Sequence, residues 1–475
     1  MDDVDVSQLR RPLPSWLSWP CHTRRYRLHV RLYAVATLIR LTLPDAVSRG
    51  WWPEVLLHWL GAVVLFASGS LLGWALCLGA VAVELLTLSD QLTQTVYLGS
   101  VALAAVVCFA GDRAGRPQRM HIDLAAAVRA LTVGTYFLAA FHKLNRDFID
   151  PQVSCANGGL RLLGEHYGSA LLGSLASYPA WPYVFLAVEF ALVVLAIARP
   201  GLGAVFAAAM HLPLTIIFAP AFAFTMASGW VCLVGEAELE HLRASWGRHK
   251  RAIILLAAIP IALSLGLPPY ERWRTDADWC VKEAVLWGVL SWLVVAWFTR
   301  PAGYAAWLGS WRELAGRRRA QCITGCVAAL WLGNGLTPYL GVQFQHTGAM
   351  LSNLRIDAGC YNHLLIPERV RIREEYIRVD QLTLATPTPD HLQDWRARLY
   401  NSEILLKDAR RWCRRSPDGV RIAGRYGSAP FVVKNACEPR VLQGHQGWPF
   451  SAPLFPRFRR FQRNLDQSCL QACVH

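Results

Sequence analysis

Apolar residues are concentrated before residue 342, in runs that short polar segments separate. Several runs approach the roughly 20 residues that a helix needs to cross about 30 Å of hydrocarbon. The pattern predicts an all-α polytopic membrane bundle over residues 28–341, with about eleven transmembrane helices (range 8–11). We place them at residues 28–46, 54–67, 70–88, 94–111, 122–141, 181–199, 202–219, 221–235, 252–267, 283–298 and 320–341.

The charges between these segments predict the topology. Cytoplasmic loops of membrane proteins are enriched in arginine and lysine. If the Arg-rich residues 1–27 form a cytoplasmic tail, eleven crossings also place four basic clusters inside, around residues 113–119, 199, 243–251 and 312–319. Residues 142–180, 268–282 and the tail from 342 are then extracytoplasmic. An error of one helix would invert everything after it.

The tail, residues 342–475, has a different pattern. The alternating stretches Tyr376–Leu384 and Gly419–Val433 predict strands, and Asp390–Arg414 predicts an amphipathic helix. We therefore expect a small C-terminal α+β domain outside the membrane.

Composition agrees with a membrane protein, because hydrophobic residues make up 54% of the chain and charged residues only 17%. The net charge of +15 sits mainly between apolar runs, and we find no nucleic-acid-binding motif. The N-terminus has no apolar core with a cleavage site, so no removable signal peptide is expected.

Cysteine spacing gives no zinc pattern, and we predict no metal site. Seven cysteines lie on the predicted outer side, where disulfides can form and persist. Their number is odd, so at least one is unpaired or shielded by the membrane, and reduced cysteines in a helix-rich protein are the alternative. They are Cys155, Cys280, Cys360, Cys413, Cys437, Cys469 and Cys473.

Ionisable residues inside a bilayer are costly, about 2.5–3.5 kcal/mol each at a helix centre, and they often mark function. Here they are Glu84, Arg129, Glu189 and His211, with His142 and Lys143 at an outer helix end. Arg129, Tyr136 and Lys143 recur every seven residues, which places them on one helix face. A lysine at the edge of an apolar cavity can serve as a base, but a lysine at a helix end more often extends to the headgroups.

Glu189 needs a partner on another helix or must be protonated, and either state can be structural. His211 can orient a substrate or pair with Glu189, and it can equally form a hydrogen bond between helices. The stretch 350–367 contains Asn353, Arg355 and His363. With Asn145, these residues either line the mouth of a cavity or form a hydrogen-bonded turn that docks the tail.

The segment FHKLNRDFIDPQVSCANGG, residues 141–159, resembles the membrane domain shared by vitamin K-dependent gamma-carboxylases and bacterial HTTM (horizontally transferred transmembrane) proteins. Two further segments carry the resemblance, AAAMHLPLTIIFAPAFAF around His211 and MLSNLRIDAGCYNHLLIP at 350–367. The likeness covers roughly residues 28–367.

The resemblance implies a reaction. Lys143 would act as the base that deprotonates a reduced quinone of the vitamin K hydroquinone type, His211 would assist, and no metal would be required. A peptide glutamate would then be carboxylated. The chain departs from the carboxylases at residues 92–100, where it has Gln94, Thr95 and Tyr97 in place of a family histidine.

Two hypotheses follow. The first is a membrane enzyme acting on a peptide or lipid at the outer leaflet, with Lys143, His211 and Glu189 at its centre and a quinol as cofactor. The second is a non-catalytic membrane protein for export, maturation or partner binding. A transporter is a third reading, but the two halves of the chain show no repeat that would favour it.

Overall fold

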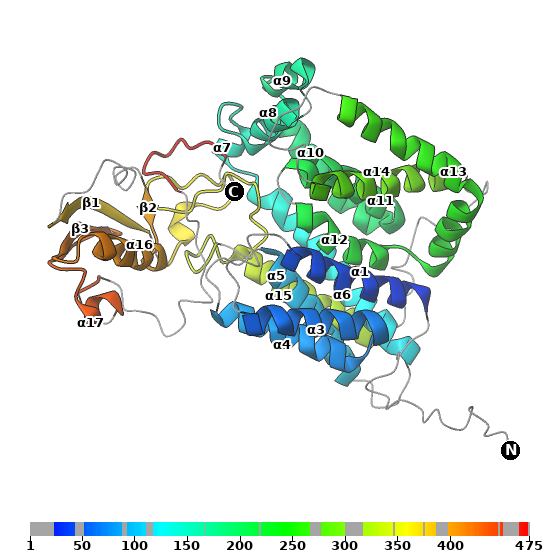
Figure 1. The fold of residues 1–475 in the computed structure, drawn as a ribbon, viewed down its shortest axis with the longest axis horizontal. Helices are drawn as coiled ribbons and strands as arrows, with labels where there is room; N and C mark the ends of the chain where they lie inside the picture. Colours follow the sequence, from blue (N-terminus) through cyan, green and yellow to red (C-terminus); the bar gives the residue numbers. More distant parts are fainter. Residues whose placement is uncertain are drawn as a thin grey trace. The chain divides into compact units, whose positions relative to one another are not determined.

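The computed structural model is mostly helical and carries one small antiparallel sheet (Figure 1). It describes residues 23–42, 52–87, 93–110, 117–166, 168–217, 220–266, 277–299, 317–344, 347–373, 376–385, 398–444, 447–449 and 465–473. These residues fall into two compact units, and helices α6, α10 and α15 each contribute to both.

Unit 1 contains the described residues of Met1–Val133, Leu192–Gly266 and Arg274–Ala329. It is entirely helical in its described part. Its helices are α1 (Arg24–Thr42), α3 (Trp52–Ser68), α4 (Leu71–Thr87), α5 (Thr93–Ala110), α11 (Pro200–Ile217), α12 (Pro220–Leu233), α13 (Glu236–Gly266) and α14 (Ala277–Phe298), with the first parts of α6 (Pro117–His142) and α15 (Arg318–Leu336) and the last part of α10 (Trp181–Ala198).

Two breaks in long apolar runs occur where the sequence predicts them. α3 and α4 form a hairpin around Gly69, which has a φ of 56° that favours glycine. α11 and α12 are likewise separate helices, and α12 begins at Pro220, a residue suited to a first helical turn.

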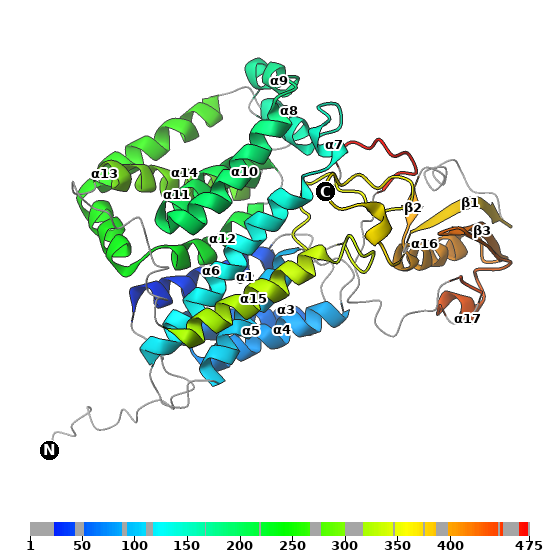
Figure 2. The same ribbon diagram turned by 180° about the vertical axis from the view of Figure 1, so that it is seen from behind.

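Unit 2 contains the described residues of Gly134–Ala191 and Leu330–His475. The last turns of α6 and α15 pack closely here, because Gly134 faces Trp331 and Gly335 faces Leu138. Figure 2 shows these two helices side by side. α6 leads into α7 (Arg146–Ile149) and the short helices α8 (Cys155–His166) and α9 (Ala170–Ala176), which precede α10.

The tail of unit 2 contains a four-stranded antiparallel sheet in the order β2-β1-β3-β4. The strands are β1 (Ile377–Leu384), β2 (Leu399–Tyr400), β3 (Val420–Tyr426) and β4 (Ala429–Val433). α16 (Ser402–Arg415) packs its apolar face on the sheet and buries Leu405 and Trp412 with Ile422. The short helices η4 (Glu368–Val370) and α17 (Pro439–Leu442) complete the tail. The predicted α+β character of the tail is confirmed.

Two predicted boundaries are wrong. The tail helix begins at Ser402 instead of Asp390, because Leu399 and Tyr400 pair with β1 and Asn401 caps the helix by accepting from the Ile404 amide. Residues 390–397 lie outside the described residues. The basic segment 243–251 is part of the 31-residue helix α13 and not a loop.

All eleven predicted membrane segments coincide with helices, but their ability to span differs. Among the described residues, two stretches are long and apolar enough to cross a bilayer, Met120–His142 and Trp181–Ala198. Shorter apolar helices occur at Val55–Ser68, Leu71–Leu85, Gln94–Ala110, Phe222–Leu233 and Trp287–Phe298. The chain is therefore mostly helical with apolar helices that fit membrane association.

Candidate functional site

The candidate site begins at the turn after α6, where the sequence places Lys143. Asn145 is fully buried and caps α7, because its side-chain oxygen accepts from the Phe148 amide at 2.8 Å. The Asn145 amide group donates to the carbonyls of His142 and Ser352. These bonds hold the Phe148 ring 5.9 Å from Lys143 Nζ, at the limit of a cation–π contact.

Lys143 forms a buried ion pair with Glu189 of α10, with 2.9 Å between Nζ and Oε1. The two side chains are only 6% and 9% exposed. Nζ also donates to the carbonyls of Ala139 at 3.1 Å and Met350 at 3.3 Å. Three acceptors thus match the three N–H bonds of an ammonium group.

Among the described residues, Glu189 is bonded through one carboxylate oxygen only. Oε1 faces Lys143, whereas Oε2 is buried and has no hydrogen-bond partner there. A buried carboxylate normally fills both oxygens, since an unsatisfied buried acceptor costs about 1–3 kcal/mol. Glu189 Oε2 can therefore accept a hydrogen bond or a proton from a ligand hydroxyl.

The segment that follows Met350 has a strained backbone beside this pair. Leu351 and Asn353 have φ values of 51° and 53°, in the left-handed region that non-glycine residues seldom adopt. The Asn353 side chain holds this turn, since it accepts from the Cys155 amide and donates to the Val153 carbonyl. Such strain persists only where the surroundings enforce it, and it often lies near functional groups.

The two predicted histidines of this unit have structural partners. His142 Nδ1 is 2.7 Å from the Tyr339 hydroxyl, and Nε2 is 3.1 Å from the Thr347 carbonyl. His363 Nε2 donates to the Phe141 carbonyl, while Nδ1 accepts from the amides of two following residues, Leu365 and Ile366. Both rings pack on Tyr339. They position the turn and leave no ring nitrogen for a substrate.

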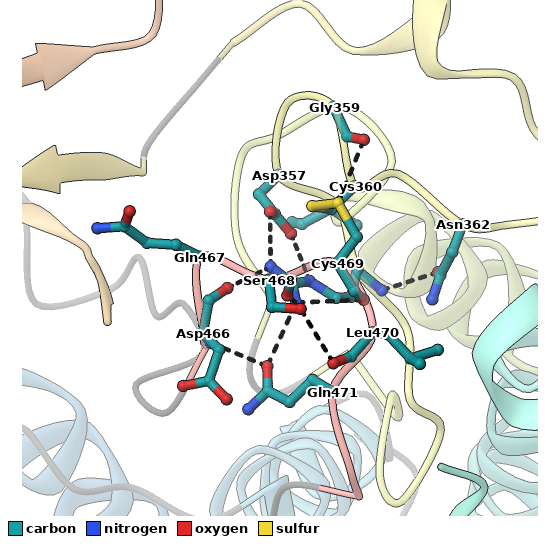
Figure 3. Close-up of polar contacts among 12 residues, drawn as sticks. Asp357, Gly359, Cys360, Asn362, Asp466, Gln467, Ser468, Cys469, Leu470 and Gln471 are labelled. Carbon is teal, nitrogen blue, oxygen red and sulfur yellow. Dashed lines mark hydrogen bonds and ion pairs between the residues drawn. A yellow bond between two sulfur atoms is a disulfide. The ribbon is translucent and has the colours of Figure 1, made fainter. Parts of the chain in front are cut away.

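Arg355 is also a structural residue. Its guanidinium binds both oxygens of Asp357 at 2.9–3.0 Å and donates to carbonyls of the C-terminal segment. Figure 3 shows Asp357 close to this segment, to which Asp466, Ser468 and Gln471 belong, and Gln471 also accepts from Arg355. Arg355 is only 2% exposed, so these bonds take the place of the hydrogen bonds that its guanidinium would form with water. They also hold the C-terminal segment on residues 352–363.

Three disulfides reinforce unit 2. They join Cys155 to Cys473, Cys360 to Cys469 and Cys413 to Cys437. Six of the seven cysteines predicted to face an oxidising compartment are therefore paired, and the side chain of Cys280 lies outside the described residues. The free cysteines of the described residues are Cys77, Cys108, Cys232, Cys322 and Cys326, all in helices of unit 1.

The remaining predicted residues are Tyr136 in unit 2 and Arg129, Glu84 and His211 in unit 1. Tyr136 is buried in α6. Arg129 donates to the Cys232 carbonyl, and Glu84 accepts from Thr95 and contacts His58, all within unit 1. His211, also in unit 1, bonds the Ala207 carbonyl and packs between Phe222 and Trp230. For His211 the bond lies within α11 and is not the hydrogen bond between helices given as its structural alternative.

Sequence reasoning missed four groups that shape the site. Phe148 and the Met350 carbonyl face the Lys143 ammonium, while Tyr339 and Thr347 hold His142. Only Phe148 carried a signal, because Asn145 is a typical N-cap three residues before it. A backbone carbonyl 207 residues away leaves no mark in the sequence.

The described residues contain no group of three or more His, Cys, Asp or Glu side chains placed to hold a metal ion. Comparisons of the chain with protein-family models, curated proteins and solved structures find no match.

Proposed function

We propose that the chain is a multi-pass membrane protein of the HTTM type, with a cytoplasmic N-terminus and an extracytoplasmic C-terminal domain. Two features support this proposal. The eleven apolar segments coincide with helices, and the three disulfides lie in the loop and tail that the charge pattern assigns to the outer side.

Within this proposal the protein is an enzyme whose reacting centre is the Lys143–Glu189 pair. The observation that carries it is the buried, unpartnered Oε2 of Glu189 beside a fully bonded ammonium. A purely structural ion pair would be expected to satisfy that oxygen. The backbone strain at Leu351 and Asn353, next to the Met350 carbonyl, adds a second sign of a functional site.

The pair can exchange a proton with a hydroxyl group. Glu189 Oε2 is the atom open to accept it, and Lys143 offers positive charge to the anion left behind. This arrangement reverses the roles that the resemblance implies, because the Lys143 ammonium has no free electron pair while three acceptors surround it. Lys143 becomes a base only after passing a proton to Glu189.

The ligand that fits best is a reduced quinone reached from the bilayer. Its hydroxyl group matches the single open acceptor, and its apolar body suits a site at the end of an apolar helix. When bound, a quinol oxidised by O2 would supply the strong base that removes a proton from a peptide or lipid at the outer leaflet, as the resemblance implies.

A non-catalytic role in export, maturation or partner binding is the second candidate. It is favoured by the complete hydrogen bonding of His142, Asn145, Arg355 and His363, which dock the tail and leave no group open to a substrate. In that case Lys143 and Glu189 serve only to join α6 and α10.

The test is oxygen-dependent conversion of a reduced naphthoquinone by the full chain in lipid vesicles, followed by mass spectrometry. We expect product from the wild type and a loss of about 100-fold or more in Glu189→Gln, since general acid–base groups contribute 10²–10⁴. Lys143→Arg keeps the charge and the ion pair but changes its geometry, and we expect a comparable loss.

The matched control is Arg425→Lys, which alters an exposed pair with Asp380 on the tail sheet and should keep the full rate. Thermal unfolding of each variant separates lost chemistry from lost folding. Full turnover by Glu189→Gln and Lys143→Arg would show that this pair is not the reacting centre. No product from any form would favour the non-catalytic candidate.

A further inference from the structure

The loop between the Lys143 turn and α10 is built as a rigid helical hairpin. α8 and α9 pack through glycines, because a Cβ on Gly164 would lie 2.9 Å from the Gly173 backbone nitrogen. Asn157, fully buried in α8, donates to the carbonyls of Ala176 and Tyr178 at the end of α9. The hairpin thus has a defined shape, and the buried hydrogen bonds of Asn157 hold its two helices together.

This rigid hairpin exposes large apolar side chains. Leu171 on α9 is 68% exposed, and Tyr178 just after it is 61% exposed. Leu162 and Leu175 are exposed as well. Leu171 and Leu175 are four residues apart and so share one face of α9. A cluster of this kind on an extracytoplasmic loop normally marks an interaction surface.

The sequence around the hairpin has the composition of a lipid contact. No Asp, Glu, Lys or Arg occurs from His166 to Val188, which covers α9 and the start of α10. α9 continues through Tyr178 into α10, one of the two candidate spans, whose first turns expose Tyr183 and Val184. Tyr178, Trp181 and Tyr183 are aromatic residues of the type that gathers at a membrane–water interface.

We infer that α9 lies in the outer leaflet, with Leu171, Leu175 and Tyr178 inserted among lipid chains just below the headgroups. The apolar surface of α9 is continuous in sequence with the exposed face of α10, so lipid that covers one reaches the other. Arg161 and Glu165, exposed on α8, would lie at the headgroup level. Residues 142–180 are then partly a membrane-inserted element and not a solvated loop.

The experiment uses the full chain in vesicles of phosphatidylethanolamine and phosphatidylglycerol. A bilayer-soluble aryl diazirine labels lipid-exposed residues, hydroxyl radicals label water-exposed residues, and mass spectrometry locates both. We expect diazirine label at Leu171, Leu175 and Tyr178 at a level within about threefold of that at Val194 and Ile197, exposed residues of α10. Ile372 and Val432, exposed aliphatic residues of the tail, should take only the water-phase label.

A variant provides the second measurement. Leu171→Asp with Leu175→Asp should abolish diazirine labelling at Tyr178 and leave labelling at Val194 unchanged. Water-phase label at Leu171 overturns the inference. Absence of both labels at Leu171, which contact with another protein would give, overturns it as well. In either case, diazirine label at Val194 still supports a membrane span. Absence of diazirine label at Val194 as well would overturn the membrane assignment itself. None of these outcomes depends on turnover at Lys143.

Discussion

At the scale of single residues, the charges of unit 2 differ in how completely they are bonded. Arg355 and Lys143 donate hydrogen bonds to several surrounding oxygens, whereas one carboxylate oxygen of Glu189 accepts none from the described residues. Because desolvated charges are costly unless paired, complete bonding indicates a structural role, and an open atom indicates a place for a ligand.

Arg355 allows a direct test of this distinction. Arg355→Lys cannot reproduce the two-pronged contact with Asp357 and the carbonyl contacts together. Breaking a buried pair of this kind costs about 3 kcal/mol or more. We expect a lower thermal unfolding midpoint for the full chain, by several degrees. Arg425→Lys changes a similar Arg–Asp pair at the surface and should shift the midpoint far less, so equal shifts would contradict the structural role of Arg355.

His363 makes stability depend on pH. Burial lowers the pKa of its imidazole below the ordinary 6.5, and protonation of Nδ1 would also break its bonds to two amides. Since the folded-state pKa lies below the unfolded one, this residue's contribution is complete above about pH 6.5 and declines as pH falls below it. Below the folded-state pKa the loss levels off.

The measurement is thermal unfolding between pH 7.5 and pH 5 of the wild type and His363→Gln. The glutamine variant should show a shallower loss of stability on acidification, although it is less stable at pH 7.5. Identical slopes for both forms would show that other groups carry the acid sensitivity.

At the scale of elements, hydrophobic periodicity located the helices but not all their ends. Apolar runs locate these helices because most positions in them are apolar. The helix predicted at Asp390–Arg414 shows the limit, since an amphipathic pattern continues smoothly through residues that pair in β2. The N-cap at Asn401 was a local signal that would have corrected the start.

The α8–α9 hairpin gives a prediction at this scale. In Gly164→Ala the new methyl group meets the Gly173 backbone, which cannot rotate away, so α9 must shift. Overpacking of this kind costs about 1–3 kcal/mol. We expect hydrogen exchange of the α9 amides to become about tenfold faster. Gly173→Ala has open space around its Cβ and should slow exchange or leave it unchanged. Equal effects of the two substitutions would argue against close packing of the hairpin.

At the scale of the whole molecule, the sequence could predict which residues need partners but not which partners they find. Glu189 demanded a partner on another helix, yet nothing in the pattern distinguished Lys143 from His211 across gaps of 46 and 22 residues. The disulfide pairing was equally open, because cysteine spacing does not determine connectivity. Tertiary packing decides these matters, and only the short-range features of the Lys143 turn could be read locally.

The positions of the cysteines, taken together with the basic clusters, make the membrane topology of the chain testable. If the N-terminus is cytoplasmic, eleven crossings place Cys322 and Cys326, exposed beside the basic start of α15, near the inner face, and the disulfides outside. In intact cells, a membrane-impermeant maleimide should label neither set. After an impermeant phosphine is added outside, Cys360 and Cys469 should become labelled, since Cys469 is exposed. Opening the cells without reductant should label Cys322 and Cys326. Labelling of Cys322 from outside would mean an error of one helix, because a single missed crossing before α15 exchanges the two sides.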